Sequence, residues 1–253
     1  MVENGLSFIA TIGLQKAKIR QGCPFCNVAD LRDVIDSQGE KILLKNKYTT
    51  LENTEQLVLI ESNRHDGDVS NYEQQEWVAI LQYAIDNWEA LLKSKAYRSV
   101  LLYKNFGPES GGSQEHPHMQ LIGLKNIAGY TEIRKKNFIG IKLAAQSGVT
   151  VNISEFPIMG FLEINVIWRT DNQLRIAAEE IQNVVSYLLN QYYQGRCQSY
   201  NLFFYKSDVR YICKIVPRFT ASPYFVGYKI SQTFNADYVA FIKQEYLAYC
   251  NNR

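Results

Sequence analysis

Histidine is scarce in this chain, which has only three among its 253 residues. They are His65, His116 and His118, and all of them lie in the first half of the sequence. Any histidine-dependent catalysis or metal binding must therefore use these three side chains. A histidine-based site built wholly from the second half is excluded, because no histidine follows His118.

Long apolar runs are missing as well. A helix that crosses a bilayer needs roughly 20 consecutive apolar residues, and no stretch of this sequence approaches that length. The opening residues lack both the basic segment and the long apolar segment of a secretory signal peptide. We therefore expect a cytoplasmic protein that does not associate with membranes.

The sequence has no strong excess of charge of either sign. Its 27 Lys and Arg residues nearly balance 25 Asp and Glu residues, which leaves a net charge of +2. Because a nucleic-acid footprint needs a marked basic excess, we expect no nucleic-acid partner. Hydrophobic residues make up 46% of the chain. That content supports a sizeable core, in one large domain or in two of about 125 residues each.

The five cysteines are odd in number, which argues against a disulfide framework in an intracellular chain. Two of them form the motif Cys23-Pro-Phe-Cys26. This spacing can bring two sulfurs to one tetrahedral metal ion, and it also occurs in redox pairs and as free thiols. A zinc site would need two further ligands, usually Cys or His.

The segment from residue 111 to residue 120 carries the other unusual pattern. A turn of Gly111, Gly112 and Ser113 precedes the sequence His116-Pro-His118. Backbone N–H groups of a glycine turn can bind an anion, and a neutral imidazole beside that anion can attack phosphorus. The proline between the histidines restricts their conformations. The simpler interpretation is a pair of surface histidines beside a turn.

Hydrophobic periodicity predicts alternating strands and helices in the first half. A helix is predicted to follow Ser70 and Glu73, which fit a capping box, and to end near Ser94. Apolar residues recur within it at three- and four-residue spacing, as in a helix with one buried face. The predicted strands cover residues 41–48, 56–61, 99–104 and 119–124.

The second half repeats this order. A strand over 161–168 precedes a helix that is capped by Asp171 and ends near Tyr193, and a hairpin follows over 200–216. The helix and the next strand are each displaced by about 101 residues between the halves. We predict an α+β fold of two similar halves, each an antiparallel sheet with a long helix. The catalytic half would span residues 1–125, and a degenerate second half would span residues 126–253.

These motifs together resemble the galactose-1-phosphate uridylyltransferase family, within the larger histidine-triad-like superfamily of nucleotide transferases and hydrolases. The matching features keep their order from residue 23 to residue 120, and a further segment near the sugar site matches in the second half. They are Cys23-x-x-Cys26, Asn46-Lys47-Tyr48, His65, Asn105, Ser113-x-x-His116-Pro-His118-x-Gln120 and Tyr224-Phe-Val-Gly-Tyr228.

The resemblance implies a structural zinc ion bound by Cys23, Cys26, His65 and His116. Such a Cys2His2 site is closed, since no position is left for water. It would join the N-terminal cysteine motif to a strand end and to the catalytic segment. Loss of the metal should then damage folding as well as activity.

The resemblance also implies that His118 attacks the α-phosphorus of a nucleoside diphosphate sugar and forms a covalent nucleotidyl-histidine. A sugar phosphate acceptor would then take the nucleotide. Gln120 would hold a phosphate oxygen. The other implied nucleotide-binding residues are Asn105, Gly111, Gly112 and Ser113. Members of the family also suggest a homodimer.

The sequence departs from the family at several positions. Lys229 stands where the family has Glu after its Val-Gly-Tyr, and Pro223 stands where the family has Lys. The identities of the nucleotide and the sugar therefore stay open. Two alternatives also stay open: a phosphorylase or hydrolase of dinucleoside polyphosphates, and a non-catalytic, zinc-stabilised nucleotide-binding protein.

Overall fold

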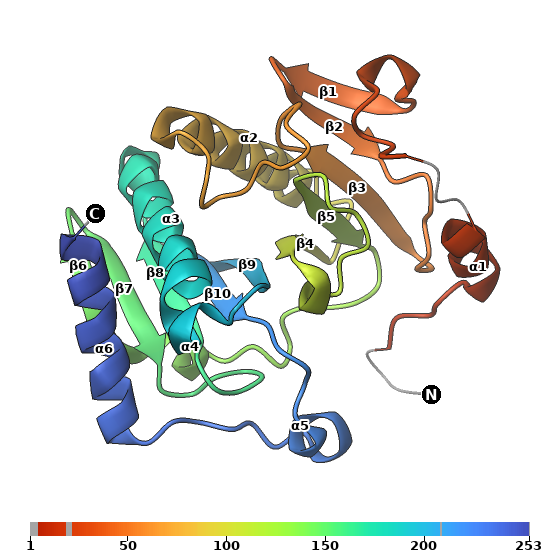
Figure 1. Ribbon diagram of the computed structural model, residues 1–253. Helices are drawn as coiled ribbons and strands as arrows, with labels where there is room; N and C mark the ends of the chain where they lie inside the picture. Colours follow the sequence, from red (N-terminus) through yellow and green to blue (C-terminus); the bar gives the residue numbers. More distant parts are fainter. Residues whose placement is uncertain (1–4, 19–21, 208, 253) are drawn as a thin grey trace. The chain divides into compact units, whose positions relative to one another are not determined.

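The computed structural model describes residues 5–18, 22–207 and 209–252 (Figure 1). The chain divides into two compact units, each made of several chain segments. The first unit comprises residues 1–67, 79–104 and 114–132, and the second comprises residues 68–78, 105–113 and 133–253. Each unit is described by itself below.

The first unit is built on antiparallel strands in the order β1-β2-β3-β5-β4. The helix α2 crosses from the second unit into the first, which contains it from Ala79 onward. The indole Nε1 of Trp88 in α2 donates a hydrogen bond to Val100 O, 2.9 Å away on β4. The elements are α1 (Ala10–Lys18), β1 (Val34–Gln38), β2 (Lys41–Lys45), β3 (Thr54–Ile60), α2 (Gln74–Lys93), β4 (Ser99–Phe106) and β5 (His118–Leu124).

The strand register decides which side chains share a face of this sheet. His118 pairs with Ile60 across β5 and β3, and Gln120 pairs with Val58. Because cross-strand partners project to the same face, His118 and Gln120 lie on the face that carries Val58 and Ile60. Those two residues form a buried cluster with neighbours on β2, against which Phe25 of the cysteine motif packs.

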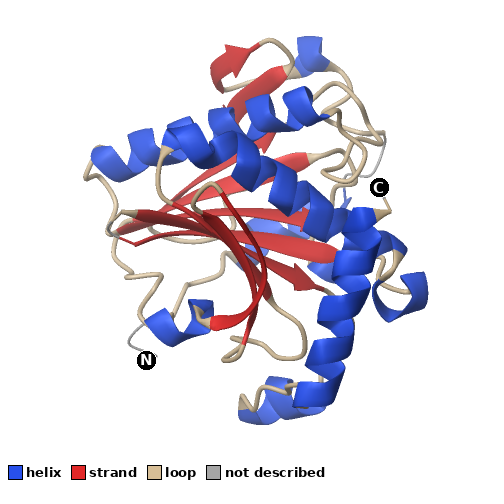
Figure 2. Ribbon diagram, turned by 90° about the vertical axis from the view of Figure 1, so that its left-hand side faces the viewer, coloured by secondary structure: helices blue, strands red, loops and turns tan. Residues whose placement is uncertain are grey.

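The second unit has a similar plan, with antiparallel strands in the order β9-β10-β8-β7-β6. The helix α3 packs on β8 and β10, and α6 packs on α3. In each unit a long helix lies against strands (Figure 2). The elements are β6 (Gly140–Gln146), β7 (Val149–Ser154), β8 (Ile164–Trp168), α3 (Leu174–Asn190), α4 (Tyr192–Gly195), β9 (Tyr200–Ser207), β10 (Arg210–Pro217), α5 (Pro223–Tyr228) and α6 (Ala236–Asn251).

The α+β class predicted from the sequence is confirmed, with an antiparallel sheet and a long helix in each unit. Every strand and long helix that the sequence pattern predicts has a counterpart within a few residues. Strands β1, β6 and β7 and helices α1, α5 and α6 were not predicted. The proposed division of the chain at residue 125 stays a prediction. None of the helices in the described residues is both long and apolar enough to cross a lipid bilayer.

Two predicted helix starts are wrong. The helix α2 begins at Gln74 rather than after Ser70, and the Ser70 hydroxyl donates to Asp68 Oδ2 at 2.8 Å. The second long helix begins at Leu174, with Gln173 rather than Asp171 at its N-cap position. Residues 171–173 form a 3-10 turn before it.

Candidate functional site

The cysteine motif forms a tight turn ahead of β1. The Cys26 N–H donates to Cys23 O at 3.4 Å, which closes the turn. Between the cysteines, the Phe25 ring packs against the hydrophobic cluster of β2 and β3. The apolar anchor in the middle of the motif therefore fixes the turn on the face of the sheet that also carries His118.

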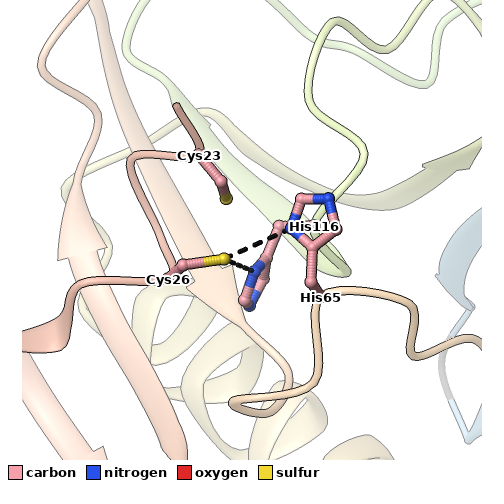
Figure 3. Close-up of side chains that lie close together, drawn as sticks. All are labelled: Cys23, Cys26, His65 and His116. Carbon is pink, nitrogen blue, oxygen red and sulfur yellow. Dashed lines mark hydrogen bonds between the residues drawn. The ribbon is translucent and has the colours of Figure 1, made fainter. Parts of the chain in front are cut away.

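Two histidines face this turn from different loops (Figure 3). Cys26 Sγ lies 3.3 Å from His65 Nδ1 and 3.5 Å from His116 Nδ1. The other nitrogen of His116, Nε2, lies 2.8 Å from the carbonyl oxygen of Ser62. Because a carbonyl only accepts, that nitrogen carries the proton and Nδ1 presents its lone pair to the cysteines. Burial lowers the pKa of His116, which favours the neutral imidazole that metal ligation requires.

The ligand atoms of Cys23, Cys26, His65 and His116 all lie within 4.8 Å of one another. Tetrahedral zinc with its usual bond lengths separates sulfur and nitrogen ligands by roughly 3.3–3.8 Å. The cluster therefore fits a metal ion after a small contraction, and its two sulfurs and two imidazoles are the donor set of a closed zinc site. The hydrogen bond from His116 to Ser62 orients the ring, as partners of metal-ligating histidines commonly do.

His118 opens β5 and is buried, with 6% of its surface exposed. Its Nδ1 lies 2.8 Å from the carbonyl oxygen of His116. The proton must be on Nδ1, because the carbonyl cannot donate, so the lone pair of the neutral ring is on Nε2. The Phe25 ring lies edge-on to the His118 ring at a centroid distance of 5.6 Å. The main chain and this contact together orient the imidazole.

Gln120 lies two residues further along β5 and projects to the same face. Tyr103, its partner on β4, donates from its hydroxyl to Gln120 Oε1 at 3.0 Å. Burial raises the pKa of Tyr103 to about 12, so the hydroxyl keeps its proton near neutral pH. With the amide oxygen engaged in this way, the NH2 group is the end of Gln120 that is directed away from Tyr103.

The glycine turn belongs to the second unit. Gly107 and Gly111 both have φ of +82°, a conformation that favours glycine. A Cβ on Gly107 would also lie 2.2 Å from Gln198 O, so that position has no room for a side chain. The N–H of Gly112 donates to Ser110 Oγ at 3.2 Å. A phosphate bound by this N–H would have to replace that bond. Ser113 is exposed.

Asn105 lies near the end of β4, just before the same turn. Its Oδ1 accepts a hydrogen bond of 2.6 Å from Nδ2 of Asn201, a buried residue of β9. Asn201 Oδ1 in turn accepts from Nη1 of Arg218 at 2.6 Å. Sequence reasoning missed both partners, because a lone Asn and a lone Arg belong to no recognisable motif. The fold alone brings them to Asn105.

The predicted site residues thus fall into two sets. The first unit brings Cys23, Cys26, His65 and His116 together, and it holds His118 and Gln120 on one face of its sheet. The second unit holds Asn105 near the end of β4, and it holds Gly111, Gly112 and Ser113 in the turn that follows. The roles predicted for these residues stay predictions.

The segment predicted to lie near a sugar forms the short helix α5. It begins after Ser222, whose side chain caps it, and it ends at Tyr228; the next residue, Lys229, has a positive φ of 57°. Tyr224 and Tyr228 on this helix are exposed.

Comparison with solved structures gives the same fold. A crystal structure of a DUF4931 family protein from Bacillus cereus is 39% identical, with a TM-score of 0.78, over 86% of this chain and 99% of that one. A uridylyltransferase structure is 15% identical, with a TM-score of 0.69, over 91% and 93% of the two chains. The ADP-glucose phosphorylase of Arabidopsis thaliana, with bound ADP-glucose, is also 15% identical, with a TM-score of 0.70, over 90% of each chain.

Sequence comparison identifies the family. A di-/tripeptide transporter of Lactobacillus helveticus is 33% identical over 98 residues, but these make up only 18% of the transporter. The match covers 36% of this chain, so the transporter's activity is not carried over. Family models described as the N-terminal and C-terminal domains of DUF4931, a domain of unknown function, match residues 8–127 and 130–247. The chain belongs to the DUF4931 family.

Proposed function

We propose that this protein is a nucleotidyltransferase that works through a covalent nucleotidyl intermediate on His118. The observation that carries the proposal is the hydrogen bond of 2.8 Å between His118 Nδ1 and His116 O. It fixes the tautomer of the neutral imidazole, whose lone pair is then on Nε2. A histidine that serves only in packing has no need of this constraint.

The reaction consists of two displacements at one phosphorus. In the first, His118 Nε2 attacks the α-phosphorus of a nucleoside diphosphate sugar. A P–N bond forms, the P–O bond to the sugar phosphate breaks, and that oxygen leaves with the electron pair. In the second, a phosphate oxygen of the acceptor attacks the same phosphorus and the P–N bond breaks. Each step then pairs an anionic phosphate with a neutral nucleophile or a good leaving group.

Hydrogen-bond donors stabilise the phosphate oxygens in this proposal. The NH2 group of Gln120, directed away from Tyr103, donates to an oxygen of the reacting phosphate. Asn105, Ser113 and the turn at Gly111 and Gly112 bind the remaining oxygens. A hydrogen bond to a charged oxygen is stronger than one to a neutral group. Amide donors at these positions would therefore stabilise a bound phosphate.

The metal in this proposal is structural zinc, held by Cys23, Cys26, His65 and His116. When bound, it supplies cross-links between the cysteine turn and the two histidine loops. All the chemical steps belong to side chains of the protein. The observation in favour of zinc is the donor set itself, in which His116 Nδ1 presents a lone pair to Cys26.

The acceptor could also be inorganic phosphate or water. The likeness to an ADP-glucose phosphorylase favours phosphate over water, and the same nucleophile would serve for dinucleoside polyphosphates. A glutamine rather than a third histidine at position 120 favours transfer over hydrolysis, because an amide cannot protonate a leaving group. We further propose a cytoplasmic homodimer, which light scattering of the purified protein would test.

Product analysis with a donor panel tests this function. UDP-glucose, ADP-glucose and diadenosine tetraphosphate are each incubated with the protein alone, with galactose 1-phosphate and with inorganic phosphate. We expect the acceptor to stimulate release of glucose 1-phosphate from the sugar donors, or of ATP from diadenosine tetraphosphate, and this release should vanish in His118→Ala. Turnover by water alone would support the hydrolase instead. Binding without turnover in any arm would support a non-catalytic protein.

A further inference from the structure

Three polar side chains of the second unit form a chain of hydrogen bonds that ends at Asn105. Arg218 Nη1 donates to Asn201 Oδ1 at 2.6 Å, and Asn201 Nδ2 donates to Asn105 Oδ1 at 2.6 Å. Asn201 is 1% exposed, and its Nδ2 also donates to Ser110 O at 3.1 Å. Asn201 therefore links an arginine, the site asparagine and the glycine turn.

The direction of these bonds is fixed by chemistry. A guanidinium has only donors, so the atom of Asn201 that faces Arg218 must be the amide oxygen. The Asn201 nitrogen then faces Asn105 and Ser110, and both of its hydrogens are used. Since that nitrogen can only donate, the atom of Asn105 that faces it must be the oxygen. Arg218 thus determines the orientation of the Asn105 amide through the intervening amide of Asn201.

The consequence for Asn105 is that its NH2 group is the end of the amide directed away from Asn201. This group lies against the glycine turn, since a Cβ on Gly112 would be 3.0 Å from Asn105 Cβ and 3.7 Å from its Nδ2. Among the described residues, no carboxylate forms a salt bridge with Arg218, and its Nε is buried without a hydrogen-bond partner. A nearby cation of this kind favours the approach of an anion to the turn.

We propose that Arg218 and Asn201 are positioning residues that hold Asn105 as a hydrogen-bond donor to a nucleotide phosphate. This inference rests on the proposed function, and it assigns a role to residues that no motif marks. Both residues lie in the part of the chain that has no histidine. The second half would therefore contribute to phosphate binding although it has lost histidine chemistry.

The variant Asn201→Asp tests the direction of the hydrogen bonds that lead from Arg218 to Asn105. The new carboxylate still accepts a hydrogen bond from Arg218, now as an ion pair. It cannot donate to Asn105. The Asn105 amide should then reverse and direct its oxygen toward the ligand. Loss of one hydrogen bond to a charged phosphate corresponds to roughly a ten- to hundredfold weaker affinity. We expect this loss for both ADP and UDP by calorimetry, with the melting temperature within a few degrees of wild type.

A second pair of variants separates positioning from simple charge repulsion. If Asn201→Asp acts through Asn105, it should weaken nucleotide binding little further in an Asn105→Ala background. Repulsion between Asp and phosphate would persist there. The matched control is Asn165→Asp, because Asn165 is another buried residue of the second unit whose Nδ2 donates to an asparagine, Asn152, at 2.8 Å. This control should leave nucleotide affinity unchanged even if it lowers stability.

Arg218→Lys and Arg218→Met provide the same comparison should Asn201→Asp fail to fold. The lysine variant, which still offers a donor and a charge, should retain more affinity than the methionine variant. Unchanged nucleotide affinity in Asn201→Asp, or in both arginine variants, would overturn the inference. The proposed function would still stand if the wild-type protein formed the adduct on His118. A wild-type protein that neither binds nucleotides nor forms the adduct would overturn both.

Discussion

At the scale of single residues, the candidate site is governed by which end of a polar side chain faces outward. A carbonyl holds His118 Nδ1, and the Tyr103 hydroxyl holds Gln120 Oε1. Each contact uses one hydrogen-bonding atom of the side chain and thereby fixes the position of the complementary atom. An imidazole nitrogen with a lone pair and an amide NH2 are what an attack on a phosphate requires.

Tyr103→Phe tests this principle at Gln120. Without the hydroxyl, the amide loses the partner that selects its orientation. We expect the first-order rate of nucleotidyl transfer to His118 to fall roughly tenfold, in line with the loss of a hydrogen bond to a charged group. Rapid-quench measurement of the adduct gives this rate.

Tyr97→Phe is the control for that variant. Tyr97 lies in the same unit, and its hydroxyl also donates to a side chain, Glu55 Oε2 at 2.8 Å. It does not contact Gln120, so its loss should leave the rate of adduct formation as in wild type. Equal rates for Tyr103→Phe and Tyr97→Phe would contradict the role given to Tyr103.

At the scale of elements, each unit joins its strands with a buried ion pair. In the first unit, Lys104 of β4 lies 2.6 Å from Glu61, which follows β3. In the second, Lys214 of β10 lies 2.8 Å from Glu163, which precedes β8. Both pairs are at most 1% exposed. Glu163 also accepts the N–H groups of Ile158 and Met159, so its pair fixes a loop as well as two strands.

Lys214→Met should destabilise the protein, because it leaves the buried Glu163 carboxylate without its cation. Removal of one partner of such a pair typically costs about 3–5 kcal/mol of unfolding free energy. Chemical denaturation would measure the loss, and Lys214→Met combined with Glu163→Gln should recover part of it. Lys93→Met is the control, since Lys93 is 74% exposed in its ion pair with Glu89 and its loss should change stability by less than about 1 kcal/mol. A loss of similar size in both lysine variants would contradict this account.

At the scale of the whole molecule, the sequence predicted the elements that have a regular hydrophobic pattern and the residues that belong to a motif. Strong periodicity identified the long helices and the strands beside them, and the family resemblance pointed to the metal cluster. Strand β1 was missed because all five of its residues are exposed, so it lacks the alternation of a half-buried strand. Asn201 and Arg218 were missed because only tertiary structure brings them to Asn105.

Metal removal should act on the whole molecule rather than on catalysis alone. In the proposed zinc site the ion would cross-link the cysteine turn and the two histidine loops, so we expect chelation to lower the melting temperature and to abolish adduct formation together. One zinc per chain should be present before treatment, by elemental analysis, and Cys26→Ser should reproduce the effect. Full stability after complete removal of the metal would contradict a structural role.

The central claim is covalent catalysis by His118, and intact mass spectrometry tests it most directly. The protein and its His118→Ala variant are incubated with UDP-glucose, ADP-glucose and diadenosine tetraphosphate without acceptor. We predict that one nucleoside monophosphate adds to the wild-type protein with at least one donor and that the variant stays unmodified. An adduct that persists in His118→Ala, or the absence of any adduct although nucleotides bind, would contradict the claim.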